Sequence, residues 1–468
     1  MRVMRRAAVA AAVALALAAA GCTPGTATAP AAAHQTTLTT GSGSASALTV
    51  APVTPGQPTA ATGAPTTTTT TAPPTLSGQL DAALGNTNSC LLVTDGTAAA
   101  TSVLYNHAAD TALTPASSQK LFVALAALDR LGPDYRFTTT VVAARPPVAG
   151  VVDALWMVGG GDPLLATAPY IAALHASRVT SGYQPTPVAS LADQLAAKGV
   201  KAVSNGIHGD DSRYERLRYL PTWSPAINHG EFDVGPLGAL EVDQGLESWT
   251  PAVVTPDPAA HGAAVLAQLL TARHVTGTPG VDQTAPAGAA VLASVTSAPM
   301  SQIILAMLQA SDNQIAELLV RELDRRAGGA GTMAGGVREV MADMGRLGLP
   351  VQGLSLVDGS GLSHANQVTC RTLLAALDQG DQPRFGALTA GLPVAGVSGG
   401  MSFLFTGTPL AGRLAAKGGY ISGVTAMVGR LSGPRPRHFA LVANGSFSFG
   451  DGLGLSERVA KIVAAYAG

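Results

Sequence analysis

Ser117 and Lys120 have the residue types and the spacing that nucleophilic catalysis requires, and they precede an apolar stretch, 121–131, that is predicted to be a helix. Residues three positions apart share one face of a helix, so the hydroxyl and the amine can meet. A serine needs a base to become a nucleophile, and a neutral lysine serves as one where burial or a nearby cation lowers its pKa. Backbone N–H groups at the helix N-terminus would also stabilise negative charge beside Ser117. The pattern makes Ser117 a candidate nucleophile and Lys120 its candidate base.

A lone Ser-x-x-Lys is a weak signal, because it is also typical of a helix N-cap followed by a solvated lysine. The chain contains only five lysines, however, and Lys120 is the only one with a serine three positions before it. Two further segments could complete a site. The Ser-Asp-Asn segment at 311–313 lies between two predicted helices, where its alternative role is an N-cap for the second helix. The Lys-Gly-Gly segment at 417–419 precedes a predicted strand, where the alternative is a glycine turn with an exposed lysine.

In this order the three segments resemble the Ser-x-x-Lys, Ser-Asp-Asn and Lys-Thr-Gly set of penicillin-binding proteins and class A β-lactamases. Four further segments narrow the resemblance: Gly159-Gly-Gly-Asp162-Pro163, Gly209-Asp-Asp-Ser212, Asp358-Gly-Ser-Gly-Leu-Ser363 and Leu392-Pro-Val-Ala-Gly396. Together they are similar to the class C low-molecular-mass penicillin-binding proteins of actinobacterial type, which are D-alanyl-D-alanine carboxypeptidases and endopeptidases. The resemblance covers nearly all of 76–468. The interval between the first two motifs, 311 − 117 = 194 positions, is much longer than in β-lactamases and matches the extra domains of this family.

The resemblance implies a role for each of five side chains. Ser117 would attack the carbonyl carbon of a D-alanyl peptide bond and form an acyl-enzyme, which water then releases. Lys120 would take the serine proton, helped by the positive field of Lys417. Ser311 would pass a proton to the leaving amine, and Asn313 would orient the acyl side of the substrate.

The same resemblance implies that substrate recognition involves the strand that begins near Lys417. The backbone N–H groups of Ser117 and Tyr420 would form the oxyanion hole, with Gly418 and Gly419 beside the substrate. The family has Thr where Gly418 stands, and that hydroxyl helps to bind the terminal carboxylate of the substrate. Asp210, or the aspartate after it, could meet the ammonium of a diamino acid in the peptide stem, with turn capping as the alternative.

Two departures from the family pattern leave the function open among three hypotheses. They are Gly418, and Gly399-Gly400-Met401 where Gly-Thr-Leu is more usual. The first hypothesis is a D-Ala-D-Ala carboxypeptidase/endopeptidase that trims peptidoglycan stem peptides and binds penicillin covalently. The second is a catalytically weakened wall-binding or scaffold protein of the same fold, and the third is a β-lactamase or esterase. The segment 358–363 is interpreted as a structural loop near the site.

The predicted fold class is α/β, with a penicillin-binding/β-lactamase-like serine-acylation domain and a large inserted β-rich region. Strands are predicted at both ends of the globular part, with helices between them, which implies one sheet assembled from distant segments. The acylation domain is assigned to 76–140 plus 296–468 and the insertion to 141–295. The strands expected in the acylation domain are 89–94, 102–105, 413–417, 420–431 and 438–444.

The N-terminal residues are predicted to direct export. Arginines precede an unbroken apolar run, 7–20, which fits a signal-peptide core and is short for a membrane span. We assign 1–21 to a signal peptide and 22–75, rich in Thr, Pro and Ala, to an extended tether. The stretch that ends at Cys22 resembles a bacterial lipoprotein signal, with simple cleavage and release as the alternative. The protein is expected on the outer face of the cytoplasmic membrane or in the cell wall, attached at most through a lipid on Cys22.

Net charge and cysteine content indicate which partners, metals and disulfides to expect. A formal net charge of -1 lacks the basic excess of a nucleic-acid-binding surface, so no nucleic-acid partner is expected. The family resemblance implies that the partners are peptidoglycan stem peptides and β-lactam antibiotics. No cofactor is expected, and no metal, because no cysteine beyond the signal has Cys or His neighbours at ligand spacing. If Cys22 is lipidated, Cys90 and Cys370 remain as an even pair in an oxidising compartment. The alternative is two separate buried thiols.

Overall fold

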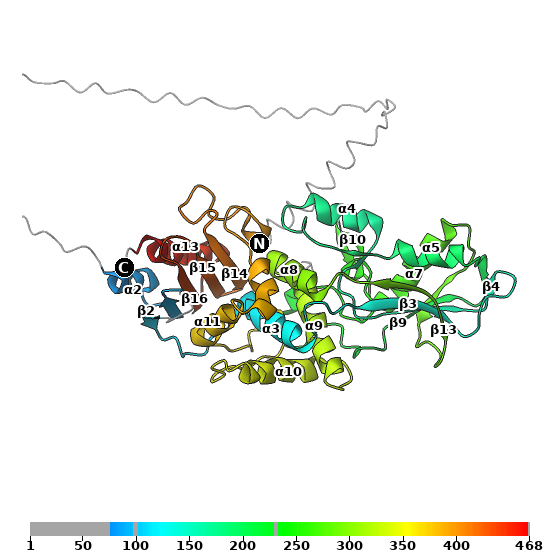
Figure 1. Cartoon of the computed structure of the whole chain (residues 1–468), viewed down its shortest axis with the longest axis horizontal. Coiled ribbons are helices and arrows are strands. Elements are labelled where there is room, and N and C mark those ends of the chain that lie inside the picture. Colours follow the sequence, from blue (N-terminus) through cyan, green and yellow to red (C-terminus); the bar gives the residue numbers. More distant parts are fainter. Residues whose placement is uncertain (1–74, 97–101, 229–232, 250, 467–468) are drawn as a thin grey trace, which may run out of the picture.

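The first sheet joins the two ends of the globular part. The computed structural model describes residues 75–96, 102–228, 233–249 and 251–466. Within them, five antiparallel strands in the order β14-β15-β16-β1-β2 form a sheet in the left half of Figure 1. The strands are β1 (Asn88–Thr94), β2 (Val103–His107), β14 (Leu414–Ile421), β15 (Val424–Leu431) and β16 (Arg437–Asn444). Because β1 pairs with β16 over its whole length, the prediction of one sheet built from distant segments is confirmed.

Helices cover both faces of the first sheet. On one face, α2 (Leu76–Leu84) and α13 (Phe449–Ala465) share an apolar cluster with the strands. On the other face lies α3 (Lys120–Arg130), whose residues are buried from its first residue to Leu128, as expected for a helix surrounded on all sides. The helices around it are α8 (Met300–Ala310), α9 (Asn313–Arg326), α10 (Met333–Arg346), α11 (Cys370–Gln379) and α12 (Gly386–Gly391).

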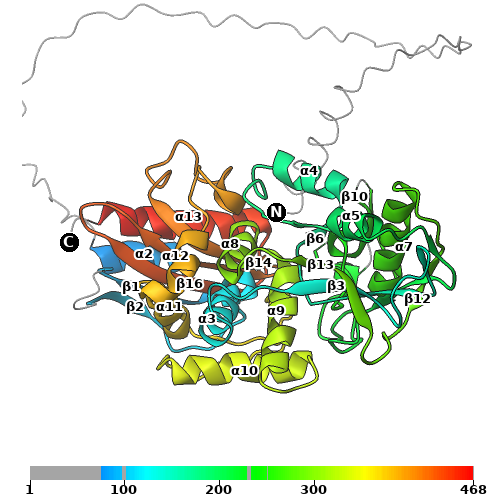
Figure 2. The ribbon, with the colours of Figure 1, turned by 45° about the vertical axis from the view of Figure 1, so that its right-hand side comes forward.

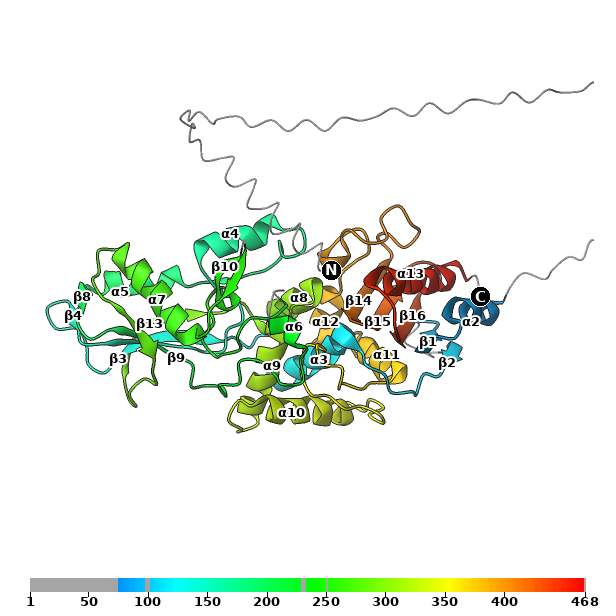
Figure 3. The same cartoon turned by 180° about the vertical axis from the view of Figure 1, so that it is seen from behind.

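A second, mixed sheet lies beside the first, with α9 between them (Figures 1 and 3). In its order β12-β9-β5-β3-β13, the first three strands are parallel and the last two pair antiparallel. Its strands are β3 (Thr138–Ala143), β5 (Leu155–Val158), β9 (Ile207–Asp210), β12 (Pro279–Asp282) and β13 (Ala290–Thr296), and α5 (Ala189–Ala197) and α7 (Pro258–Thr271) pack against it. The predicted α/β class with an additional sheet is confirmed. Because β3 belongs wholly to this sheet, the predicted limit at 140 falls inside a strand.

Short elements complete the region between β3 and β13. They are α4 (Ala168–Ala176), α6 (Pro225–Asn228) and the strand pairs β4 (Val151–Val152) with β8 (Ala202–Val203), β6 (Leu165–Ala166) with β7 (Thr186–Pro187), and β10 (Leu246–Trp249) with β11 (Ala252–Val254). Three-residue turns lie at Asp243–Gly245, Pro383–Phe385 and Gly399–Met401.

One predicted strand boundary is wrong. A glycine pair usually predicts a turn, and a break was expected at Gly418 and Gly419. Instead β14 runs straight through both residues, and the turn to β15 comes later, where Gly423 has a φ of 69°. Gly419 serves close packing: a Cβ there would lie 2.8 Å from the carbonyl oxygen of Pro115 and 3.0 Å from the backbone nitrogen of Ser117. The strand can approach the Ser117 turn only because this residue has no side chain.

A disulfide joins Cys90 of β1 to Cys370 at the start of α11, with the two Cα atoms 5.9 Å apart. The pair expected from the cysteine count is therefore present. The predicted signal peptide 1–21, Cys22 and nearly all of the tether 22–75 lie outside the described residues. None of the described helices is long and apolar enough to cross a membrane.

Candidate active site

Ser117 lies on a single 3₁₀ turn, Ala116–Gln119, that leads directly into α3. The sequence predicts both residues on the first turn of an α-helix, whereas only Lys120 belongs to α3. In a 3₁₀ turn, residues i and i+3 lie directly above one another, which aligns the two side chains more closely than an α-helix would. The Nζ of Lys120 lies 2.8 Å from the Oγ of Ser117. Figure 2 shows α3 beside β14, which carries Lys417, and α9, which begins at Asn313.

The amine of Lys120 is fully buried and faces three oxygens. Besides Ser117, it donates to the Oδ1 of Asn313 at 2.7 Å and to the backbone carbonyl of Ser360 at 2.7 Å. Asn313 is fixed in this orientation because its Nδ2 donates to the carbonyl of Asp233 at 2.9 Å. A carbonyl oxygen can only accept a hydrogen bond, and a neutral amine has two N–H groups and one lone pair. A neutral Lys120 that directs its two N–H groups to these two oxygens would have its lone pair available for the hydroxyl proton of Ser117.

A second buried lysine faces the same space. Lys417 on β14 donates from its Nζ to the Oγ of Ser311 at 2.9 Å and to the carbonyl of Gly418 at 2.6 Å. Ser311 has a left-handed backbone conformation with φ 57°, which ends α8 and turns its hydroxyl toward this lysine. Asp312 is the N-cap of α9 and accepts a hydrogen bond from the backbone N–H of Ile315 at 3.1 Å. The Ser-Asp-Asn segment therefore combines the capping role with a hydroxyl that faces Lys417.

The edge of β14 supplies backbone groups to the site. β14 is the outer strand of its sheet, so alternate N–H and C=O groups point away from β15. The carbonyl of Gly418 points outward, since it accepts from Lys417. Tyr420 lies two residues further on and has the same orientation, which directs its N–H to the same open edge. Its ring packs edge-on against Phe449 of α13, with centroids 4.9 Å apart, which leaves the backbone as the part of Tyr420 that faces the predicted site.

Asp210, predicted as a contact for the peptide stem, does not join this cluster. It ends β9 in the second sheet and is buried. Its Oδ1 accepts from the N–H of Ser212 at 2.9 Å and its Oδ2 from the N–H of Ala285 at 2.8 Å. Both carboxylate oxygens are thus engaged by backbone donors of neighbouring turns. The turn-capping alternative accounts for both oxygens of Asp210, and its role in substrate binding stays a prediction.

The comparisons with known proteins agree with this geometry. Residues 77–256 and 242–465 match the model of the D-Ala-D-Ala carboxypeptidase 3 (S13) family. The chain belongs to this family. It is 30% identical to a D-alanyl-D-alanine carboxypeptidase of Actinomadura sp. (strain R39), with 83% of each chain covered. It is also 32% identical to a carboxypeptidase of Mycobacterium tuberculosis, with 73% of each chain covered.

The fold of this S13 protein is also similar to that of a solved structure over most of the chain. Penicillin binding protein 4 (dacB) from Haemophilus influenzae has a TM-score of 0.69 and 19% sequence identity, and the match covers 83% of this chain and 99% of that one. At this identity the match concerns the fold. The resemblance expected from the three motifs is confirmed at the level of the family.

Two buried acids lie behind Lys120: Glu317, which the sequence reasoning did not single out, and Asp358, which it named only as the start of a structural loop near the site. Glu317 accepts from the backbone N–H groups of Gly359 and Ser360, at 3.0 and 2.8 Å. Asp358 accepts from several donors, among them the Nε1 of Trp223 at 2.9 Å. One signal was available: Glu317 lies four residues after Asn313 on α9, so both project from the same helix face. The contacts of Asp358 join segments more than a hundred residues apart, and local spacing does not reveal them.

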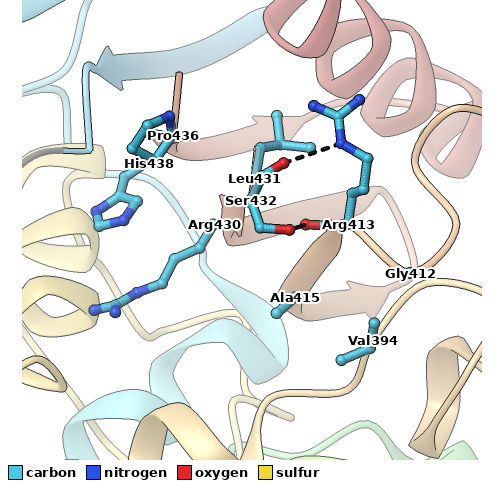
Figure 4. A pocket seen from close by; sticks show the side chains of 9 residues that line it. All are labelled: Val394, Gly412, Arg413, Ala415, Arg430, Leu431, Ser432, Pro436 and His438. Carbon is cyan, nitrogen blue, oxygen red and sulfur yellow. Dashed lines mark hydrogen bonds between the residues drawn. The ribbon is translucent and has the colours of Figure 1, made fainter. Parts of the chain in front are cut away.

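A pocket of about 310 Å³ lies toward the other end of β14 (Figure 4). Its lining comprises Val394, Gly412, Arg413, Ala415, Arg430, Leu431, Ser432, Pro436 and His438. Arg430 pairs with Asp381, and the Nδ1 of His438 lies 2.7 Å from the Oδ1 of Asp378, so both side chains have carboxylate partners. The pocket contains no member of the Ser117 cluster. In the part of the chain that the structure describes, no group of His, Cys, Asp or Glu could hold a metal ion.

Proposed function

We propose that the protein is a serine-type D-Ala-D-Ala carboxypeptidase/endopeptidase that trims peptidoglycan stem peptides through a Ser117 acyl-enzyme. The observation that carries this proposal is the fully buried amine of Lys120, 2.8 Å from the Oγ of Ser117. A buried lysine in hydrogen-bonding contact with a serine is suited to act as its base, because burial disfavours the charged ammonium. The names of the S13 relatives supply the reaction and the substrate class.

The proposed reaction assigns one step to each polar group. Lys120 takes the hydroxyl proton as the Oγ of Ser117 attacks the carbonyl carbon, and the backbone N–H groups of Ser117 and Tyr420 stabilise the oxyanion. Ser311 then transfers a proton to the leaving amine, and the proton that Lys120 took from Ser117 replaces it on Ser311, so that the C–N bond breaks and D-alanine departs with both groups restored. Lys417 supports this step because its Nζ donates to the Ser311 hydroxyl at 2.9 Å. Water attacks the acyl-enzyme and frees the shortened peptide.

Release of D-alanine from a synthetic pentapeptide that ends in D-Ala-D-Ala tests this function. We expect turnover by the wild-type protein and its loss after incubation with penicillin, because the β-lactam would acylate the same serine. A similar structure, penicillin binding protein 4 from Haemophilus influenzae, is described as a complex with a β-lactam. Rapid hydrolysis of penicillin would favour a β-lactamase instead. Absence of both turnover and labelling would favour the wall-binding scaffold.

Gly418 is the observation that favours a weakened enzyme as the second candidate. A Cβ at this position would meet nothing nearer than the carbonyl oxygen of Ala426, at 4.0 Å, and the residue lies in extended strand backbone. A threonine therefore fits here without strain. What the site lacks at residue 418 is a hydroxyl that could donate to a substrate carboxylate.

Gly418→Thr is expected to raise the specificity constant for a D-Ala-D-Ala peptide by about 10- to 100-fold, since a hydrogen bond to a charged group contributes roughly 1.5–3 kcal/mol. The rate on a neutral ester that lacks the carboxylate should change little. Steady-state kinetics of both substrates on both proteins give the comparison. Equal changes on the two substrates would show that a missing hydroxyl does not limit carboxylate recognition.

The cellular setting is part of the proposal. The predicted signal peptide 1–21 would export the chain, and a lipid on Cys22 would hold it on the outer face of the cytoplasmic membrane. A polyproline-like tether over 22–75 would reach roughly 150 Å at about 3.1 Å per residue. That reach would carry the acylation domain, assigned to 76–140 and 296–468 with 141–295 inserted, into the cell wall.

A further inference from the structure

The loop from Asp358 to Gly361 lies directly behind Lys120 and is held from several directions. Asp358 is fully buried and its two oxygens accept five hydrogen bonds. The donors, at 2.8 to 2.9 Å, are the Nε2 of Gln119, the Nε1 of Trp223, the N–H of Gly361, the N–H of Ser363 and the Nδ2 of Asn366. Asp358 thus ties the loop to the Ser117 turn and to the segment between the two halves of the acylation domain.

A single peptide group connects Asp358 to the amine of Lys120. The peptide between Ser360 and Gly361 directs its carbonyl to the Nζ of Lys120 at 2.7 Å. Its N–H, contributed by Gly361, donates to the Oδ1 of Asp358 at 2.9 Å. A carboxylate on the N–H side of a peptide polarises its carbonyl, which strengthens the hydrogen bond on the other side. Asp358 therefore acts on Lys120 through the peptide between them.

Glu317 fixes the same loop from the side of α9. Its carboxylate is fully buried and accepts the two preceding N–H groups of the loop, those of Gly359 and Ser360. Burial, and then the charge of Asp358, raise the pKa of Glu317 to about 7. The loop packs closely against the Ser117 turn: Gly361 has a φ of 84°, and a Cβ there would lie 2.1 Å from the carbonyl oxygen of Ala116.

We propose that Glu317 and Asp358 are positioning residues for acylation, which hold the Ser360 carbonyl so that it keeps the Nζ of Lys120 at the Oγ of Ser117. This inference rests on the proposed acyl-enzyme function. Neither acid contacts the serine. Each acts through the loop, and together they determine whether the lysine lone pair points at the hydroxyl.

The variants Glu317→Gln and Asp358→Asn test the inference through the rate of penicillin acylation. An amide at either position turns an N–H donor toward other N–H donors, which displaces the loop. Because a misplacement of about 1 Å can cost about 100-fold, the acylation rate at saturating penicillin should fall by about 10- to 100-fold. The half-saturating concentration should change little, because neither acid touches the ligand.

Glu322→Gln is the matched control, with the same substitution on the same helix. Glu322 is equally buried, but it accepts from Tyr135, Arg213 and Tyr214 on the side of the second sheet. This variant should lose thermal stability and keep the wild-type acylation rate. Acylation slowed equally by Glu322→Gln and Glu317→Gln would reduce the effect to general destabilisation and overturn the proposal.

The pH dependence of acylation gives a readout that a purely structural role would not change. Glu317 faces Asp358 on the loop, Arg321 on its own helix, and Lys120 through the Ser360 carbonyl. Glu317 is ionised only above its pKa of about 7, and in that range Glu317→Gln removes a negative charge near Lys120 and disfavours the ammonium form. An acid limb of the rate profile that lies above pH 7 should therefore move to lower pH in Glu317→Gln. Glu317→Asp keeps the charge and shortens the side chain. Glu317→Asp should be acylated slowly by penicillin, with an unshifted acid limb. It replaces Glu317→Gln as the test of the positioning role if the amide variant does not fold.

Three outcomes are decisive when all the proteins are labelled in parallel. Slow acylation by both amide variants, with a shifted acid limb for Glu317→Gln, supports the positioning role. Wild-type rates and an unshifted profile in folded Glu317→Gln and Asp358→Asn overturn it while the proposed function stands. A wild-type protein that penicillin does not label overturns the function and the positioning role together.

Discussion

Lys120→Met slows the acylation of Ser117 by penicillin by about 10²- to 10⁴-fold, the range that general base catalysis contributes. Methionine has nearly the length of lysine and cannot accept the hydroxyl proton. The amine it replaces lies 2.8 Å from the Ser117 Oγ and is fully buried, so solvent does not readily supply a substitute base. Stopped-flow or quenched labelling with a fluorescent penicillin measures the rate, and thermal unfolding shows whether the variant is folded.

Lys198→Met provides the matched control for that measurement. Lys198 follows α5 in the region of the second sheet and its side chain is exposed. The substitution is chemically identical, yet it should leave the acylation rate unchanged. A folded Lys120→Met protein that acylates at the wild-type rate would remove the lysine from the mechanism.

Replacing both Cys90 and Cys370 by alanine is expected to lower the free energy of unfolding by about 4–5 kcal/mol, the contribution that chain-entropy models assign to very long loops. The two cysteines are 280 positions apart, so their bond strongly restricts the unfolded chain. The bond also joins β1 to α11, and both cysteines belong to the apolar cluster that surrounds α3. Urea unfolding of the oxidised wild type and the double variant measures the difference.

Cys22→Ala is the control for the disulfide prediction, since it removes a cysteine that the bond does not use. Its unfolding midpoint should equal that of the wild type. Two thiols at positions 90 and 370 that react with iodoacetamide in the native exported protein would contradict the prediction.

The chemistry of the site was predictable because it follows local sequence patterns. Ser117 and Lys120 lie three residues apart, and that spacing brings the side chains together in a 3₁₀ turn as well as in an α-helix. The Ser-Asp-Asn segment was predicted to end one helix and begin another, and Ser311 and Asp312 do so. Such features depend on neighbours within a few residues, which a single sequence displays.

The features that local sequence patterns did not reveal depend on contacts between distant segments. From the local sequence, Gly418 and Gly419 predict a turn. In the structure, a glycine is needed at 419 because β14 packs closely against the Ser117 turn there. Asp210 carries a charge that suits a ligand, yet its partners are the backbone N–H groups of Ser212 and Ala285. The contact of Lys120 with Asn313 spans 193 positions, and only the family resemblance pointed to it.

The account depends most directly on the identity of the acylated residue. Intact-mass and peptide mapping after incubation with penicillin should place one adduct on the peptide that contains Ser117. Ser117→Ala should abolish the adduct, whereas Ser118→Ala, which removes only a hydroxyl bonded to the Pro115 carbonyl, should keep it. An adduct that maps to another residue, or one that survives in Ser117→Ala, would contradict the assignment of Ser117 as the nucleophile.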